Sequence, residues 1–158
     1  MKTKRATITV ERARLPLPKT DDAGWLRLRV GLWPEQTRRE LDADRSIFRE
    51  RPDRNAVFFA RRADGRLAGF LEASLREYAE GCATSPVGFI EGWYVEPAHR
   101  ASGVGRALMR TAEEWARSQG CRELGSDTWI DHESSQRAHE ALGFEVVDRC
   151  VNFKKALR

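Results

Sequence analysis

Residues 94–108 read YVEPAHRASGVGRAL and join a strand-like run to a helix-like run. Pro97 ends the strand because proline cannot donate to a β-ladder. Gly103 and Gly105 permit backbone conformations closed to other residues, so several N–H groups can converge on one point. The helix that follows adds unpaired N–H groups and the positive end of its dipole. Together these features predict a loop that binds a phosphate or pyrophosphate.

Two arginines, Arg100 and Arg106, can add charge-assisted contacts to such an anion. Other glycine loops fit less well. A P-loop requires Gly-Lys followed by Ser or Thr, whereas Arg106 follows Gly105 here. A dinucleotide fingerprint requires a third glycine where Leu108 stands, and about fifty residues after the loop are too few for a doubly wound domain. A glycine-rich turn before an ordinary helix is the simpler alternative.

The whole chain has the size and composition of one domain. Its 158 residues are 41% hydrophobic and 33% charged, with a net charge of +4. No apolar run approaches the ~20 residues of a membrane helix, and the N-terminus lacks the apolar core of a signal peptide. Cys82, Cys121 and Cys150 lack metal-ligand spacing and suit reduced thiols. We therefore expect one cytoplasmic domain over residues 1–158, without a metal. The basic residues are scattered, so we expect no nucleic-acid partner.

Helix-like and strand-like patterns alternate along the chain. We predict strands over residues 7–10, 57–61, 66–75, 87–95, 122–127, 144–147 and 151–155. We predict helices from the capping pair Asp21-Asp22 to Pro34, and over residues 35–48, 104–118 and 133–142. Asp64-Gly65 predicts a hairpin turn, and Gly88 and Gly92 indicate a bulge or a close backbone approach. These elements predict an α+β domain with a central mixed, mostly antiparallel sheet and about four helices.

The pattern V-x-P-x-x-R-x-x-G-x-G-x-x-L over residues 95–108 resembles the acetyl-CoA-binding motif of the GNAT superfamily of N-acetyltransferases. Residues 138–144, AHEALGF, are similar to that family's closing helix-turn-strand. The resemblance implies a GNAT fold, in which two central strands splay apart and the pantetheine of acetyl-CoA fills the gap. It implies that the amides of residues 103–105 hold the pyrophosphate. The cofactor-binding residues would be Tyr94, Val95, Arg100, Ala101, Ser102, Gly103, Val104, Gly105 and Arg106.

A narrower resemblance runs from about residue 25 to the end of the chain. The segments are LWP (32–34), GC (81–82), SP (85–86), FIEG (89–92), GCRE (120–123), SDT (126–128) and SQ (135–136), followed by His139. They are similar to the chromosomal type of aminoglycoside 6′-N-acetyltransferases. The resemblance implies acetylation of the 6′-amine of these antibiotics and a homodimer. Residues 1–20 are expected to be partly an N-terminal extension.

An aminoglycoside carries several ammonium groups, so its pocket should present carboxylates. Glu72, Glu91 and Asp127 are the candidates on or beside expected strands. A carboxylate on a central strand is costly unless it has a function or a partner, and this favours Glu91 and Asp127. Trp33 and Tyr78 are candidates for the apolar walls around the sugar rings.

Acetyl transfer requires a neutral amine, so a base must first remove a proton. We assign this role to Glu91 or Asp127, acting directly or through a water. Backbone N–H groups near Tyr94 and Val95 would polarise the thioester carbonyl. His139 occupies the place of a tyrosine that, in the superfamily, donates to the departing sulfur. Histidine can also donate, although a helix histidine satisfied by packing is the alternative.

Two other functions are compatible with the same cofactor loop. A protein N-acetyltransferase would differ only on the acceptor side, where an open groove would replace an acidic pocket. A non-catalytic acyl-CoA-binding module would retain the fold without turnover.

Overall fold

The computed structural model describes residues 8–157. Five strands form one sheet in the order β1-β2-β3-β4-β5. They are β1 (Ile8–Arg12), β2 (Asn55–Arg62), β3 (Leu67–Arg76), β4 (Val87–Val95) and β5 (Leu124–Ser126). The first four strands pair antiparallel, and β5 pairs parallel to β4. The predicted mixed, mostly antiparallel sheet is therefore confirmed, and so is the hairpin at Gly65, whose φ is 84°.

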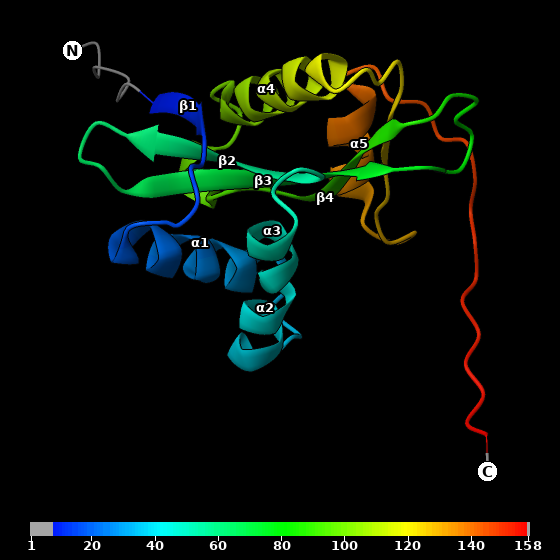
Figure 1. The fold of residues 1–158 in the computed structure, drawn as a ribbon, viewed down its shortest axis with the longest axis horizontal. Coiled ribbons are helices and arrows are strands. Elements are labelled where there is room, and N and C mark those ends of the chain that lie inside the picture. The colour runs from blue at the N-terminus through cyan, green and yellow to red at the C-terminus, as the bar shows by residue number, and fades with distance from the viewer. Residues whose placement is uncertain (1–7, 158) are drawn as a thin grey trace.

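Helices cover both faces of the sheet (Figure 1). They are α1 (Lys19–Leu32), α2 (Arg38–Asp44), α3 (Ser46–Glu50), α4 (Val104–Ser118) and α5 (Glu133–Glu140). Successive strand side chains point to opposite faces, so Phe58 and Leu71 pack against α4 whereas Phe59 and Phe70 pack against α1. Within residues 8–157, no helix combines the length and apolar character needed to cross a membrane.

Two helix predictions need correction. Asp21 and Asp22 lie in the first turn of α1, which starts directly after Pro18, and do not cap it. The single helix expected over residues 35–48 is two helices, α2 and α3. Thr37 and Glu40 form a capping box that starts α2 at Arg38, since each side chain bonds the other residue's backbone N–H. The chain then bends at Arg45, between the two helices.

The centre of the sheet opens where β4 leaves β5. Ala73 pairs with Ile90 and Glu72 pairs with Gly92, so Glu91 is the extra residue of a bulge. The β4–β5 ladder runs only from Gly88 to Ile90. Beyond that point, the edge of β4 that faces β5 has no strand partner in the described part of the chain. The bulge expected near Gly92 and the splayed central strands are both confirmed.

The two ends of the chain differ from expectation. The strand predicted over residues 7–10 is β1, which runs on to Arg12, so the chain from Ile8 belongs to the sheet; Thr7 lies outside the described residues. The strands predicted over residues 144–147 and 151–155 are wrong. Residues 145–157, the C-terminal arm, form no strand and leave the body of the domain (Figure 1). A strand requires a partner for its backbone groups, and residues 145–157 make no backbone hydrogen bond to the rest of the described chain, although Val147 lies against Gly81.

Candidate functional site

The loop between β4 and α4 has the geometry of an anion cradle. After the 3-10 turn Pro97–His99, two residues take left-handed backbone conformations, Ala101 with φ 54° and Gly103 with φ 90°. Helix α4 then begins at Val104, and no side chain among residues 8–157 caps its first turn. The N–H groups at this helix start are therefore open to an external acceptor. The predicted residues Arg100 to Arg106 all come together in this cradle.

Side-chain contacts hold the cradle in shape and keep positive charge beside it. Arg100 Nε donates to the Val95 carbonyl oxygen over 2.8 Å, and its guanidinium lies 5.4 Å from the Tyr94 ring. Arg106 donates to the carbonyl oxygen of Ala141, at 3.4 Å. Both arginines are exposed. The Tyr94 side chain itself points toward Gly31 in α1, so only the backbone of Tyr94 faces the cofactor side.

The residues of this region fit a phosphorylated cofactor with an amide-bearing arm. A Cβ on Gly105 would lie 3.0 Å from the Trp93 ring, so the helix start is packed closely onto β4. The buried Trp93 Nε1–H has no acceptor among the described residues. The open β4 edge continues from the cradle toward Glu91. A chain of acceptor groups leading away from a pyrophosphate, as in acetyl-CoA, suits such a row of donors.

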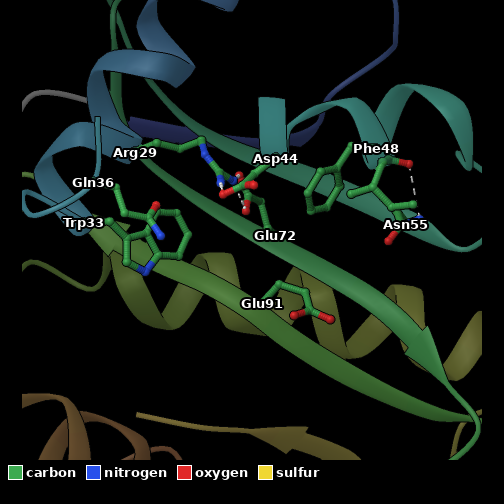
Figure 2. A pocket seen from close by; sticks show the side chains of 9 residues that line it. Arg29, Trp33, Gln36, Asp44, Phe48, Asn55, Glu72 and Glu91 are labelled. Atoms are coloured by element: carbon green, nitrogen blue, oxygen red, sulfur yellow. Dashed lines mark hydrogen bonds and ion pairs between the residues drawn. The ribbon is translucent and has the colours of Figure 1, made fainter. Parts of the chain in front are cut away.

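A cavity of about 390 Å³ lies between the sheet and the helices α1, α2 and α3 (Figure 2). Its lining residues are Arg29, Trp33, Gln36, Asp44, Ile47, Phe48, Asn55, Glu72 and Glu91. Three of the predicted substrate residues, Trp33, Glu72 and Glu91, are therefore brought together. Tyr78 lies outside this lining and is 66% exposed. Asp127 also lies outside it, exposed and one residue beyond β5, so its expected place on a strand is wrong.

Glu72 is buried under the floor of the cavity and fully partnered. Trp25 Nε1 donates to Glu72 Oε1 over 2.7 Å, and the Arg29 guanidinium donates to both carboxylate oxygens. Burial raises the pKa of Glu72, and the Arg29 charge and the two sets of hydrogen bonds act against that rise. Arg29 also lies 4.6 Å from the Trp33 ring. Glu72 thus orders the aromatic wall of the cavity through Arg29.

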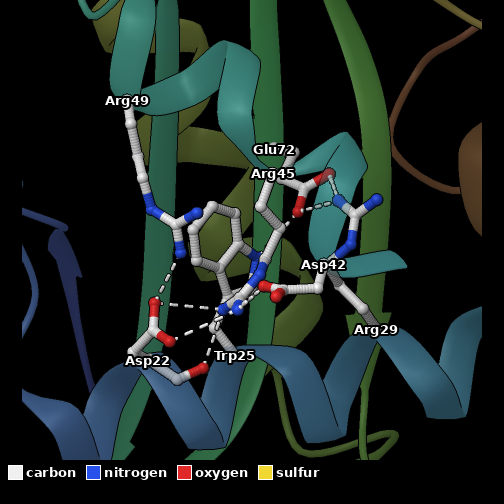
Figure 3. A network of polar contacts seen from close by, with 7 residues as sticks. All are labelled: Asp22, Trp25, Arg29, Asp42, Arg45, Arg49 and Glu72. Atoms are coloured by element: carbon white, nitrogen blue, oxygen red, sulfur yellow. Dashed lines mark hydrogen bonds and ion pairs between the residues drawn. The ribbon is translucent and has the colours of Figure 1, made fainter. Parts of the chain in front are cut away.

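A polar network continues from Glu72 to the outer surface (Figure 3). The buried Arg45 guanidinium lies 4.9 Å from the Trp25 ring and donates to the Asp22 carbonyl oxygen over 2.8 Å. Arg45 also pairs with Asp42, and Arg49 donates to Asp22 Oδ1 at 2.8 Å. These contacts tie α1, α2 and α3 to one another. The helical wall of the cavity is therefore held by charged pairs as well as by apolar packing.

Glu91 is positioned by the bulge and by two β3 side chains. The Ser74 hydroxyl donates to Glu91 Oε1, and Arg76 donates to Oε1 and Oε2, at 2.9 and 2.8 Å from its terminal nitrogen. The Arg76 guanidinium is itself stacked 3.4 Å from the centre of the Phe89 ring. The Glu91 carboxylate is half-buried and faces the cavity in Figure 2. Of the two carboxylates predicted to be catalytic, Glu91 is the one whose orientation is fixed by hydrogen bonds.

His139 lies apart from the cavity lining, on α5. Its Nδ1 is 2.8 Å from the Ser135 carbonyl oxygen, and its Nε2 is 2.8 Å from Ser126 Oγ. The ring packs edge-on against Trp93, with 5.4 Å between ring centres. The predicted proton donor therefore reaches the opening between β4 and β5 through the Ser126 hydroxyl.

Sequence reasoning missed Arg29, Gln36 and Asp44. A signal existed for Arg29, because it lies four residues after Trp25 on the apolar stripe of α1. An arginine on such a stripe requires a buried carboxylate partner, which is Glu72. Asp44 gave no signal, since it is one of many acidic residues on short polar helices. Asp44 lines the cavity because of the way α2 packs on the domain. Its carboxylate lies 3.6 Å from an Arg29 terminal nitrogen.

Comparison with known proteins places the chain in a family. The model of the acetyltransferase (GNAT) family matches residues 24–144, and the chain belongs to that family. Within it, the chain is 44% identical over 145 residues to an aminoglycoside N(6')-acetyltransferase type 1 from Stenotrophomonas maltophilia, covering 87% of this chain and 88% of the relative.

Solved structures agree with this placement. The structure of AAC(6')-Iy in complex with the bisubstrate analogue CoA-S-monomethyl-acetylneamine has a TM-score of 0.84 and 36% identity, covering 96% of this chain and 100% of that one. The aminoglycoside N-acetyltransferase AAC(6')-Iy in complex with CoA has a TM-score of 0.85 and 34% identity, covering 99% and 100%.

Proposed function

We propose that this chain transfers the acetyl group of acetyl-CoA to the 6′-amine of aminoglycosides. The observation that carries the proposal is the open edge of β4. It runs from the anion cradle beyond Val95 to Glu91, which lines the cavity, and so connects a place for the cofactor with a place for a cation. The matched relatives are named for this reaction, and one solved neighbour holds an analogue that joins CoA to an aminoglycoside fragment.

Each part of the site has a proposed role. The amides of Gly103, Val104 and Gly105 would hold the pyrophosphate, with Arg100 and Arg106 beside it. The cofactor supplies an acetyl group bound as a thioester. Glu91 or Asp127 would remove the proton of the attacking ammonium, directly or through a water. Backbone N–H groups of β4 near Tyr94 and Val95 would polarise the carbonyl. Trp33 would face a sugar ring, and the exposed Tyr78 and Asp127 would contact substrate outside the cavity lining.

Direct transfer, without a covalent enzyme intermediate, is supported by the state of Cys82, the cysteine in the loop between β3 and β4. Burial, together with the charges of Glu123 and Glu80, raises the pKa of Cys82. A raised pKa disfavours the nucleophilic thiolate. All three cysteines are free, which suits a reducing compartment, and we place the activity in the cytoplasm.

The test is thiol release from acetyl-CoA by the purified full chain, with and without kanamycin or tobramycin. We expect release that depends on the drug. The matched control is an aminoglycoside with a hydroxyl in place of the 6′-amine, which should give none. If the chain bound CoA but released no thiol with any aminoglycoside, its family membership would stand and aminoglycosides would be rejected as the acetyl acceptors.

The homodimer is also part of this proposal, and the C-terminal arm supports it. The arm exposes Val146, Val147, Val151, Phe153 and Leu157, and Phe153 is 94% exposed. Apolar and polar residues alternate from Val151 to Lys154, as in a strand with one buried face. On the other side, β5 is the last strand of the sheet in residues 8–157 and leaves an edge open. We expect the arms of two copies to cross and pair with the partner's sheet.

Sedimentation of the full chain tests the homodimer. We expect a dimer for the natural sequence and a monomer for Phe153→Glu, because a charge on the apolar face of the arm cannot be buried. The control Asn152→Glu, on the alternate face, should leave the dimer intact. A monomeric natural chain would contradict the proposal.

A further inference from the structure

The His139 ring is held in place by contacts at both nitrogens. One nitrogen is hydrogen-bonded to a backbone carbonyl oxygen, and the other lies next to a serine hydroxyl. The Ser135 carbonyl oxygen, 2.8 Å from Nδ1, can only accept, so Nδ1 carries a proton. Nε2 lies 2.8 Å from Ser126 Oγ and is the nitrogen that gains or loses a proton. The ring is packed edge-on between Trp93 and Phe144, at 5.4 and 5.2 Å between ring centres. The Ser126 hydroxyl is therefore the polar side-chain neighbour of His139 Nε2 among the described residues.

Ser126 stands at the point where the central strands separate. It is the last residue of β5, and its partner Ile90 is the last β4 residue in the ladder. The next β4 residue is Glu91, which lines the cavity. An acetyl group passing from the cradle to an amine beside Glu91 must lie near this vertex. The half-buried Ser126 would then lie between the His139 imidazole and the acetyl group.

We infer that Ser126 is a catalytic residue that protonates the departing sulfur, with His139 as the positioning residue that supplies its proton. The inference rests on the acetyl transfer proposed above. When Nε2 is protonated, it donates to Ser126 Oγ and leaves the Ser126 hydroxyl proton free to point to the vertex. As the carbon–sulfur bond breaks, the Ser126 O–H proton passes to the sulfur, and Oγ takes the Nε2 proton. Serine is regenerated, the imidazolium becomes neutral imidazole, the thiolate becomes a thiol, and solvent recharges the imidazole.

A binding measurement tests the contact without turnover. Calorimetry would compare CoA with desulfo-CoA, which lacks the sulfur. We expect the natural chain to bind CoA about tenfold more tightly, as one hydrogen bond contributes about that factor. Ser126→Ala should bind the two equally, and Ser126→Thr, which keeps the hydroxyl, should restore the preference. Equal binding of both ligands by the natural chain would overturn the contact.

Steady-state kinetics tests the proton transfer. Ser126→Ala should lower kcat by about 100-fold, the lower range for a positioned acid, with a small change in the KM of the aminoglycoside. Ser126→Thr should recover most of the rate. The exposed Ser134, on the helix α5 that also carries His139, offers the control, and Ser134→Ala should match the natural chain. A natural chain that releases thiol and a Ser126→Ala variant with the same kcat would overturn the role of Ser126 while leaving the acetyltransferase intact. A natural chain without drug-dependent release would instead remove the proposed function.

Nitrogen NMR of His139 in the cofactor-free protein provides a third readout. We expect the neutral ring to carry its proton on Nδ1, since the Ser135 carbonyl oxygen at 2.8 Å can only accept and is much nearer than the Ser135 hydroxyl at 3.5 Å. A neutral ring protonated on Nε2 would overturn the relay, because Nδ1 and not Nε2 would then be the nitrogen that gains and loses the proton.

Discussion

The cofactor cradle and the acceptor cavity lie on two sides of the same strand, β4, yet the chain builds them differently. The cradle is made from consecutive residues after Val95, and its main donors are backbone N–H groups. The cavity is lined by residues of three helices and three strands, and its charged groups are held by long-range pairs such as Arg29–Glu72 and Arg76–Glu91. A backbone site depends on local conformation, whereas a side-chain pocket depends on which distant elements pack together. Changes to the two should therefore have separable effects.

The largest effect is expected at Glu91, one of the two proposed bases. Glu91→Gln keeps the shape of the side chain and one acceptor oxygen for Arg76, but cannot accept a proton from the amine. We expect kcat to fall by about 10² to 10⁴-fold, with unchanged affinity for CoA. Asp127→Asn, at an exposed position, should act mainly through the KM of the aminoglycoside. The control is Glu77→Gln, since Glu77 also pairs with an arginine, Arg54, but lies outside the cavity lining. A larger loss of kcat in Asp127→Asn than in Glu91→Gln would assign the base to Asp127.

The next largest effect is expected on stability, from Arg29→Leu. This change leaves the buried Glu72 without its cation, and breaking such a pair costs about 3–5 kcal/mol. Burial already raises the pKa of Glu72 in the natural protein, and removing Arg29 raises it further above its unfolded value, because the opposing charge is lost. The contribution of Glu72 to the free energy of unfolding is then fully present below its pKa in the unfolded chain. It is lost as the pH rises through its pKa in the folded protein. Urea unfolding at about pH 5 and about pH 8 measures this, with the larger loss at the higher pH.

Two companions of Arg29→Leu separate the charge from the packing. Adding Glu72→Gln should recover part of the stability and remove the pH dependence, since no buried charge is left. Arg137→Leu, which breaks an exposed pair with Glu133, should change stability little. An Arg29→Leu variant with the natural stability at both pH values would mean that the cavity wall does not depend on this pair.

A smaller effect is expected for Gly103→Val, and it should be confined to the binding of CoA. The φ of 90° is costly for a β-branched residue, by about 1–3 kcal/mol, and the side chain would stand where the backbone meets phosphate. We expect calorimetry to show CoA binding weakened by about 10- to 100-fold. Gly120→Val is the matched control, because Gly120 has φ 85° at the far end of the same helix. Normal CoA affinity in Gly103→Val would reject the cradle as the pyrophosphate site.

The same contrast explains which features could be predicted from sequence. The hairpin at Gly65, helix α4 and the cradle depend on neighbouring residues, and each follows from local patterns. Glu72 was correctly placed on a strand, but its partner Arg29 is 43 positions away, and no local pattern joins them. Asp127 was misplaced because the end of β5 is set by the divergence from β4. The prediction of the two C-terminal strands was wrong for a related reason. The alternating pattern indicates that the arm can form a strand, but it does not show where a partner strand lies.

The smallest effect is expected from Asp44→Asn. It tests whether a change in the cavity can leave the binding of CoA in the cradle unaffected. Asp44 lines the cavity but its side chain is 54% exposed, so its attraction for an ammonium group is screened by water and salt. We expect the KM of the aminoglycoside to rise by only about two- to fivefold at low salt, with less effect near 0.5 M salt, and CoA affinity to stay unchanged. Asp53→Asn, on an exposed turn outside the cavity lining, is the control. A rise in KM independent of salt would mean that Asp44 contacts the substrate directly in a site closed to water, because only a desolvated charge escapes screening.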